Sequence, residues 1–321
     1  MNIVGLDVSQ DTLDCYLITQ KGITDYLKVS NNSDGFKHIV EWLKQHRIRK
    51  VAICMEATGI YYEKVAYYLN QFHVVYVVNP LKIKGYAKSR FQRTKTDKVD
   101  AKLIAEYAHR HWDILQPYQP PTEQQQRLQR LLTLQYQLKQ QVQQTKNRIH
   151  ASQDEYVIKV HQAILEVLQI RLLETTQHIH VLIRQQQSLW QHYQNLLTIP
   201  GMGKESIPIV LHYLNQRQFK SVNQFIAFAG LNPDVQQSGS SVNKKTGSGR
   251  YNNRRLKSVF FMPALVAYRL GVFGQMVKNL ENRKKPKMVI LGAIMRKLAK
   301  VAYYLHKTNQ PFDKTRYQIT E

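Results

Sequence analysis

Four acidic side chains lie where carboxylates could act together on a metal ion. Asp7 lies in the apolar run IVGLDV, where an unpaired carboxylate is costly and a cation would offset its charge. Glu56 ends the short apolar segment VAICME. Asp97 and Asp100 are three residues apart, so a helix would project both from one face. These residue types predict a Mg²⁺ site, and a pair of such ions stabilises the attacking and leaving oxygens at phosphorus.

Each carboxylate also has an ordinary structural interpretation. Asp97 could cap a helix, Asp100 could pair with Arg93 or Lys95, and Glu56 could be a solvated strand end. For any one of these residues, the structural role and metal binding are about equally supported. For all four together, in a basic protein with this order of strands, we favour metal binding.

Other candidate ligands are set aside. Asp11 and Asp14, in SQDTLD, are interpreted as turn residues. Only two cysteines are present, Cys15 and Cys54, too few for a disulfide framework or a zinc cluster.

A second candidate for chemistry is the serine cluster in QQSGSSVNKK, which contains Ser238, Ser240 and Ser241. A serine that attacks phosphorus needs an exposed position and cations to hold the developing charge. The cations nearby in sequence are Lys244, Lys245, Arg250, Arg254 and Arg255. A loop of this composition is also typical of plain phosphate contacts or of flexible linkers, and the residues alone do not choose among the serines.

The segment PGMGK, residues 200–204, resembles the hairpin of a helix-hairpin-helix element. Backbone N–H groups at such a helix start, with Lys204, would contact phosphate. An ordinary turn that opens a domain fits the same residues.

The charge of the chain favours a polyanionic partner. Among 321 residues, 46 lysines and arginines face 22 acidic residues, for a net charge of +24. The excess is largest in residues 199–321, which hold 21 basic and 5 acidic side chains. Nucleic acid is therefore the expected partner.

The pattern of apolar residues predicts three domains. Residues 1–121 begin with three short strands and continue with alternating helices and strands, which predicts an α/β RNase H-like domain. Residues 122–198 contain no Gly or Pro and show helical leucine spacing, typical of a coiled coil or helical hairpin. That segment fits an intramolecular pair and a dimerising stalk equally well. Residues 199–321 predict a mainly α, basic domain.

The sequence predicts a cytoplasmic protein. It shows neither a charged leader with an apolar core nor an apolar run of the length of a membrane span.

The ordered motifs resemble the DEDD transposases of the insertion-sequence 110 family, relatives of the pilin-gene invertases. In the first half they are GLDVS, ICMEATGIYYE and KTDKVDAKLIA. In the second half they are IPGMG, FIAFAGLNPDVQQSG and GRYNNRRLKSVFFMPA. Any one is weak, but the ordered set is specific and covers nearly the whole chain.

The resemblance implies more than the residues show. It implies a RuvC-like domain whose four acidic residues are Asp7, Glu56, Asp97 and Asp100, and it singles out Ser238 as the covalent nucleophile. It further implies a homo-oligomer (dimer or tetramer) with a composite active site, double-stranded DNA as substrate, and a structured guide RNA from the element. The stretch after Ser238 departs from the family pattern at Asn252 and Asn253.

Two other functions remain open at this stage. A RuvC-like nuclease or junction resolvase would hydrolyse DNA through water and leave no protein–DNA adduct. A non-catalytic nucleic-acid-binding protein would need only the charge and the long helices, and would show no dependence on metal.

Overall fold

The computed structural model describes residues 1–91, 96–234, 237–238, 242–243, 247–248, 253–313 and 315. The chain forms two compact units, Met1–Pro120 and Pro121–Glu321.

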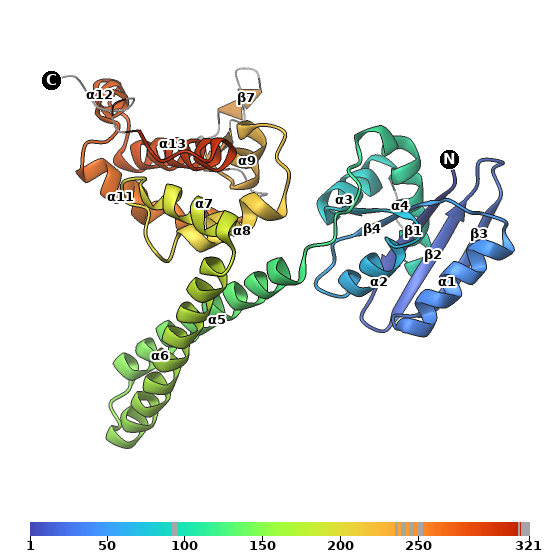
Figure 1. Ribbon diagram of the computed structural model, residues 1–321, viewed down its shortest axis with the longest axis horizontal. Coiled ribbons are helices and arrows are strands. Elements are labelled where there is room, and N and C mark those ends of the chain that lie inside the picture. The colour runs from blue at the N-terminus through green and yellow to red at the C-terminus, as the bar shows by residue number, and fades with distance from the viewer. Residues whose placement is uncertain are drawn as a thin grey trace. The chain divides into compact units, whose positions relative to one another are not determined.

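The first unit is built on a five-stranded mixed sheet (Figure 1). Its strands are β1 (Ile3–Val8), β2 (Thr12–Ile18), β3 (Thr24–Ser30), β4 (Ala52–Glu56) and β5 (Val74–Val78). Their order is β3-β2-β1-β4-β5, in which β2 is antiparallel to both β1 and β3. The pairs β1–β4 and β4–β5 are parallel. This is the RNase H-like arrangement, so the predicted fold class is confirmed.

Helices cover both faces of this sheet. They are α1 (Ser33–Gln45), α2 (Tyr62–Leu69), α3 (Pro80–Ser89), α4 (Asp97–His111) and the short 3₁₀ helix η1 (Trp112–Ile114). Side chains of α1 and α2 share one core with Val4 and Leu6, whereas α3 and α4 share the opposite core with Ile3 and Cys54. Because side chains alternate along β1, its odd-numbered residues face α4.

Gly5 lets α4 lie directly on β1. A Cβ atom at this position would lie 2.2 Å from the carbonyl oxygen of Ala101 and 2.3 Å from the amide nitrogen of Ala105, both on α4. Only a residue without a side chain permits this approach. The start of α4 is consequently held close to the end of β1.

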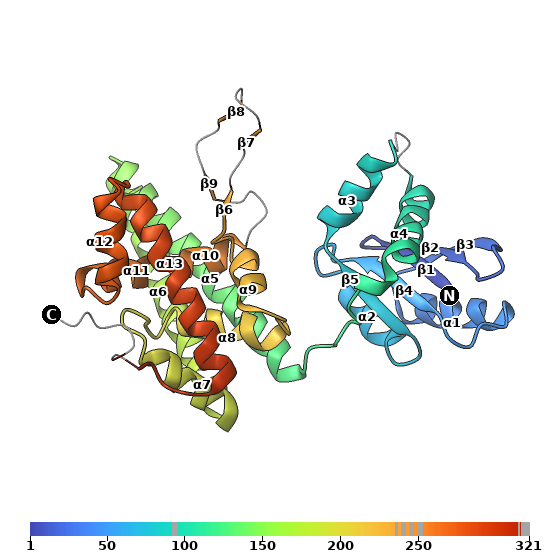
Figure 2. The same cartoon turned by 90° about the horizontal axis from the view of Figure 1, so that it is seen from above.

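The second unit is mainly helical, as predicted. Its helices are α5 (Glu123–Ala151), α6 (Glu155–Arg184), α7 (Gln187–Leu197), α8 (Ile207–Gln216), α9 (Val222–Phe228), α10 (Arg254–Val259), α11 (Phe261–Arg269), α12 (Gly274–Asn282) and α13 (Lys287–Thr308). Its two-residue strands are β6 (Pro233–Asp234), β7 (Gln237–Ser238), β8 (Val242–Asn243) and β9 (Gly247–Ser248). Figure 2 shows α13 running along the other C-terminal helices.

The helices α5 and α6 form an antiparallel hairpin (Figure 1). A capping box at Thr122 and Gln125 starts α5, and the Asp154 side chain caps α6. Leu128 and Ile183, near the base of the hairpin, belong to the same apolar core as α7 and α8. The intramolecular helical pair is thus present, and a dimerising role stays a prediction.

Among the described residues, no single helix is long and apolar enough to cross a membrane. The bent pair Arg254–Arg269 and Gly274–Asn282 passes such a test by length and composition only.

Candidate active site

Asp7 lies one residue before the end of β1, on the face that carries α4. Its side chain is partly buried. Burial first, and then the negative charges of Asp100, Asp97 and Asp14, raise the pKa of Asp7 from 3.8 to about 6. Three further carboxylates therefore act electrostatically on the same group.

The first turn of α4 carries Asp97 and Asp100. The N-cap is Thr96, whose hydroxyl accepts a hydrogen bond from the Val99 amide at 3.3 Å. Thr96, and not Asp97, is therefore the N-cap of α4. Arg93 and Lys95, the possible partners of Asp100, lie outside the described residues. Acidic groups in a first helical turn are also favoured by the helix dipole.

Glu56 is the last residue of β4. The parallel pairing of β1 with β4 extends to Leu6 opposite Met55, so Asp7 and Glu56 are the next residues on two neighbouring strands. Because side chains alternate along both strands, the two carboxylates belong to the same face of the sheet.

The sequence predicts that Asp11 and Asp14 are turn residues, and for Asp14 this prediction is wrong. Asp11 lies at a bend, but Asp14 is the third residue of β2 and is only 2% exposed. It lies directly across from Asp7 in the antiparallel register. The segment TLDCYLI does contain the pattern of a strand: every second residue, Leu13, Cys15 and Leu17, packs in the core on the other face of the sheet.

Asp14 is held by two side chains of β3. The Tyr26 hydroxyl donates a hydrogen bond to one carboxylate oxygen, and the Lys28 ammonium lies 3.3 Å from the other. Lys28 Nζ also lies 3.2 Å from an Asp97 oxygen. Hydrogen bonds to Asp97 and Asp14 raise the pKa of Lys28, so its ammonium is charged.

The chemistry of the donor set, which consists of carboxylates, fits a divalent cation. Within the described residues, no group of three His, Cys, Asp or Glu side chains is arranged to hold a metal ion. Burial raises the pKa of Asp7, and the negative charges of Asp100, Asp97 and Asp14 raise it further. The Lys28 ammonium lies within 3.3 Å of Asp14 and 3.2 Å of Asp97, so a cation already offsets part of this negative charge. Carboxylate oxygens are the ligands that Mg²⁺ prefers.

In the second unit, the structure describes the backbone of the predicted nucleophile, Ser238. Ser238 ends β7 and pairs with Val242 of β8. Lys244, Lys245 and Arg250 lie outside the described residues.

Arg254 and Arg255 differ although they are adjacent at the start of α10. Arg254 is exposed. The Arg255 guanidinium donates a hydrogen bond to the Leu132 carbonyl on α5 and lies 5.3 Å from the Tyr136 ring centre. Burial lowers the pKa of Arg255. Arg255 therefore ties α10 to α5, a structural contact that the sequence did not reveal.

The turn before α8 is part of the core packing. A Cβ at Gly201, where φ is +86°, would lie 2.6 Å from the Pro263 carbonyl of α11. This close contact, together with the positive φ, accounts for a glycine at position 201. Lys204 is exposed beside that turn.

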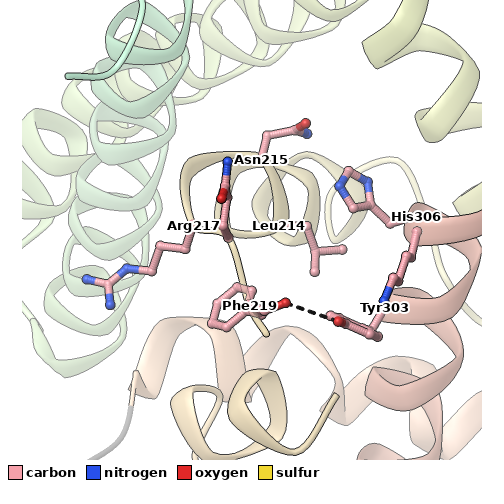
Figure 3. A pocket seen from close by; sticks show the side chains of 8 residues that line it. Leu214, Asn215, Arg217, Phe219, Tyr303 and His306 are labelled. Atoms are coloured by element: carbon pink, nitrogen blue, oxygen red, sulfur yellow. Dashed lines mark hydrogen bonds between the residues drawn. The ribbon is translucent and has the colours of Figure 1, made fainter. Parts of the chain in front are cut away.

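A separate cavity of about 360 Å³ lies between the end of α8 and α13. Figure 3 shows its wall, where the Tyr303 hydroxyl donates to the Phe219 carbonyl at 3.2 Å. Arg217, His306 and Lys307 also line it. Its lining includes none of the predicted site residues that the structure describes.

The order and pairing of the strands define an RNase H-like fold. The family model for DEDD transposases of the IS110 type matches residues 4–158, and the model for the transposase IS116/IS110/IS902 family matches residues 193–276. The pilin gene-inverting proteins of Moraxella lacunata and Moraxella bovis are each 33% identical over 317 residues, which cover 97% of both chains. This chain belongs to the IS110 family of transposases and is a DNA recombinase.

A solved RuvC structure from Thermus thermophilus aligns with 37% of this chain and 100% of its own. The sequence identity is 15% and the TM-score is 0.29. That likeness adds nothing to the strand order described above.

Proposed function

We propose that this transposase cuts and rejoins DNA strands with a Mg²⁺ site formed by Asp7, Glu56, Asp97 and Asp100, and with Ser238 as the nucleophile. The observation that carries the proposed metal site is the placement of its carboxylates: Asp7 and Glu56 lie at the ends of neighbouring parallel strands, on one face of the sheet. The helix that carries Asp97 and Asp100 in its first turn packs on that face over Gly5. A site that gathers like charges in this way is suited to binding cations.

Each group has a defined task in the reaction. The metal, when bound, stabilises negative charge on the oxygens at phosphorus. The Ser238 hydroxyl gives its proton to solvent water and its oxygen bonds to phosphorus. The bond from phosphorus to the leaving DNA oxygen breaks, and that oxygen takes up a proton from solvent water. The same steps in reverse join a new strand end and release the serine.

The cations of the second unit serve to hold nucleic acid. We assign Lys204, Lys244, Lys245, Arg250 and Arg254 to phosphate contacts; Arg255 was predicted with them, and its guanidinium also has the internal contact described above. The excess of basic residues in this unit supports duplex DNA together with an element-encoded guide RNA as partners. We further propose a dimer or tetramer in which the acidic site and Ser238 come from different subunits.

The experiment combines the purified protein with its flanking non-coding RNA, Mg²⁺ and labelled duplexes that carry the element junction and the target. Wild type is compared with Ser238→Ala, Ser240→Ala and Asp7→Asn. We expect a denaturation-resistant protein–DNA adduct that is lost in the Ser238 and Asp7 variants and retained in the Ser240 variant. Cleavage without any adduct would instead establish a hydrolytic nuclease, and binding without metal-dependent cleavage would establish a non-catalytic protein.

A further inference from the structure

Lys28 joins three elements at the edge of the candidate site. It lies on β3, and its Nζ atom is 3.3 Å from Asp14 on β2 and 3.2 Å from Asp97 on α4. The Lys28 side chain is 46% exposed, whereas the Asp14 side chain is 3% exposed. The ammonium therefore reaches from solvent to a buried carboxylate and to one of the predicted metal ligands.

A second contact connects the same strand to the same helix. The Lys98 ammonium lies 4.9 Å from the Tyr26 ring centre, and the Tyr26 hydroxyl donates to Asp14. β3 thus contacts the first turn of α4 through two successive residues, Asp97 and Lys98. That turn also carries Asp100, so these contacts help to fix two of the four predicted ligands.

We propose that the Lys28 ammonium and a divalent cation compete for Asp97, so that Lys28 positions the first turn of α4 on the sheet and gives way when metal binds. The inference rests on the proposed function, because it assumes that the carboxylates bind metal. Lys28 is a positioning residue that acts through Asp97.

The physical basis is the concentration of like charge. Asp7 and Asp14 lie opposite each other, and Asp97 and Asp100 act on Asp7 from the helix. A lysine ammonium is a compact point charge on a flexible stem, so it neutralises carboxylates without the fixed geometry that a guanidinium imposes. The same flexibility lets it move into solvent once a divalent cation neutralises Asp97.

The test measures metal binding by the full-length protein without DNA. Free Mn²⁺ is titrated by electron paramagnetic resonance with wild type, Lys28→Met and Lys102→Met. Lys102 is a matched control, since it lies on α4, is 51% exposed and pairs only distantly with Glu106, at 3.9 Å. We expect Lys28→Met to bind Mn²⁺ about tenfold more tightly than wild type, and Lys102→Met to stay within about twofold.

A second measurement uses the unaltered protein, so it does not depend on how a variant folds. Brief acetylation of lysines is followed by mass spectrometry with and without saturating Mg²⁺. The acetylation rate of Lys28 should rise when Mg²⁺ is present, because its ammonium leaves Asp14 and Asp97, whereas the rate at Lys102 should not change.

The outcomes separate this inference from the function on which it rests. Equal or weaker Mn²⁺ binding by Lys28→Met, with normal binding by wild type, overturns the role of Lys28 and leaves the metal site intact. Lys28 acetylation that does not respond to Mg²⁺ overturns it as well. Failure of both wild type and Lys28→Met to bind Mn²⁺ overturns the inference and the proposed metal site together.

Discussion

Each unit contains a partly buried charged side chain, Arg255 in the second unit and Asp7 in the first. The two side chains differ in the charge of their neighbours. In the second unit, Arg255 donates to a backbone carbonyl and lies over an aromatic ring. In the first unit, burial and then the negative charges of Asp100, Asp97 and Asp14 raise the pKa of Asp7. Burial disfavours the charged form of both groups. A carbonyl and a ring compensate the Arg255 charge in part, whereas neighbouring negative charges add to the cost at Asp7. The comparison indicates that Arg255 serves structure, and it agrees with the proposed role of Asp7 as a metal ligand.

The largest expected effect is on catalysis by the first unit. Asp7→Asn keeps the shape of the side chain but removes its charge, so we expect the rate of DNA cleavage to fall by about a thousandfold. The measurement is single-turnover cleavage of a labelled junction duplex. Asp11→Asn, at the neighbouring exposed bend, is the control and should cleave like wild type. If Asp7→Asn and Asp11→Asn cleave DNA at the same rate, Asp7 is not part of the catalytic site.

The second prediction compares one close-packed glycine in each unit. Gly5→Ala should destabilise the first unit by about 3 kcal/mol, because its Cβ would meet the α4 backbone at 2.2 Å. Gly201→Ala should destabilise the second unit by a similar amount, about 3 kcal/mol. Hydrogen exchange followed by mass spectrometry reports the two units separately.

The same two variants should differ in metal binding. Gly5→Ala displaces α4, so Mn²⁺ binding should weaken, whereas Gly201→Ala should leave it unchanged. Loss of Mn²⁺ binding in both variants would show that metal affinity depends on overall stability rather than on the placement of α4.

The third prediction concerns the structural charge. Arg255→Met retains the apolar stem but loses the guanidinium contacts with the Leu132 carbonyl and the Tyr136 ring, and should destabilise the second unit by about 2 kcal/mol. Arg254→Met, at the exposed neighbouring position, should change stability by less than about 0.5 kcal/mol. Hydrogen exchange in α5 and α10 is the measurement. A larger effect at Arg254 would contradict the structural role of Arg255.

The smallest effect is on the stability of the metal-free first unit. The pKa of Asp7 is raised to about 6, so the folded state retains a proton that the unfolded chain loses near 3.8. Wild type therefore loses stability from this group as pH rises between these values. Asp7→Asn should be more stable by about 1 kcal/mol at pH 7.5, after allowance for solvent screening, and equal to wild type below about pH 4. A gain that persists at low pH would point to a cause other than charge.

The four carboxylates were predictable because the signals are local. Asp7 interrupts an apolar strand, Glu56 ends another, and the spacing of Asp97 and Asp100 suits a helix. Their roles as ligands stay predictions. Asp14 was missed because the preceding polar residues resemble a turn, which hid the alternation of TLDCYLI. Arg255 could not be separated from Arg254, since a sequence does not show which of two neighbouring side chains meets another helix.

The sequence by itself determined the order of strands and helices, the charge of each unit and the four acidic candidates, because periodicity, capping and composition act over a few residues. Only the tertiary structure decided that Asp14 lies opposite Asp7 and that Lys28 lies between Asp14 and Asp97. Lys28 and Asp97 are 69 residues apart in the chain. Their contact depends on strand register and on the approach of α4 over Gly5, both of which arise from packing between distant segments.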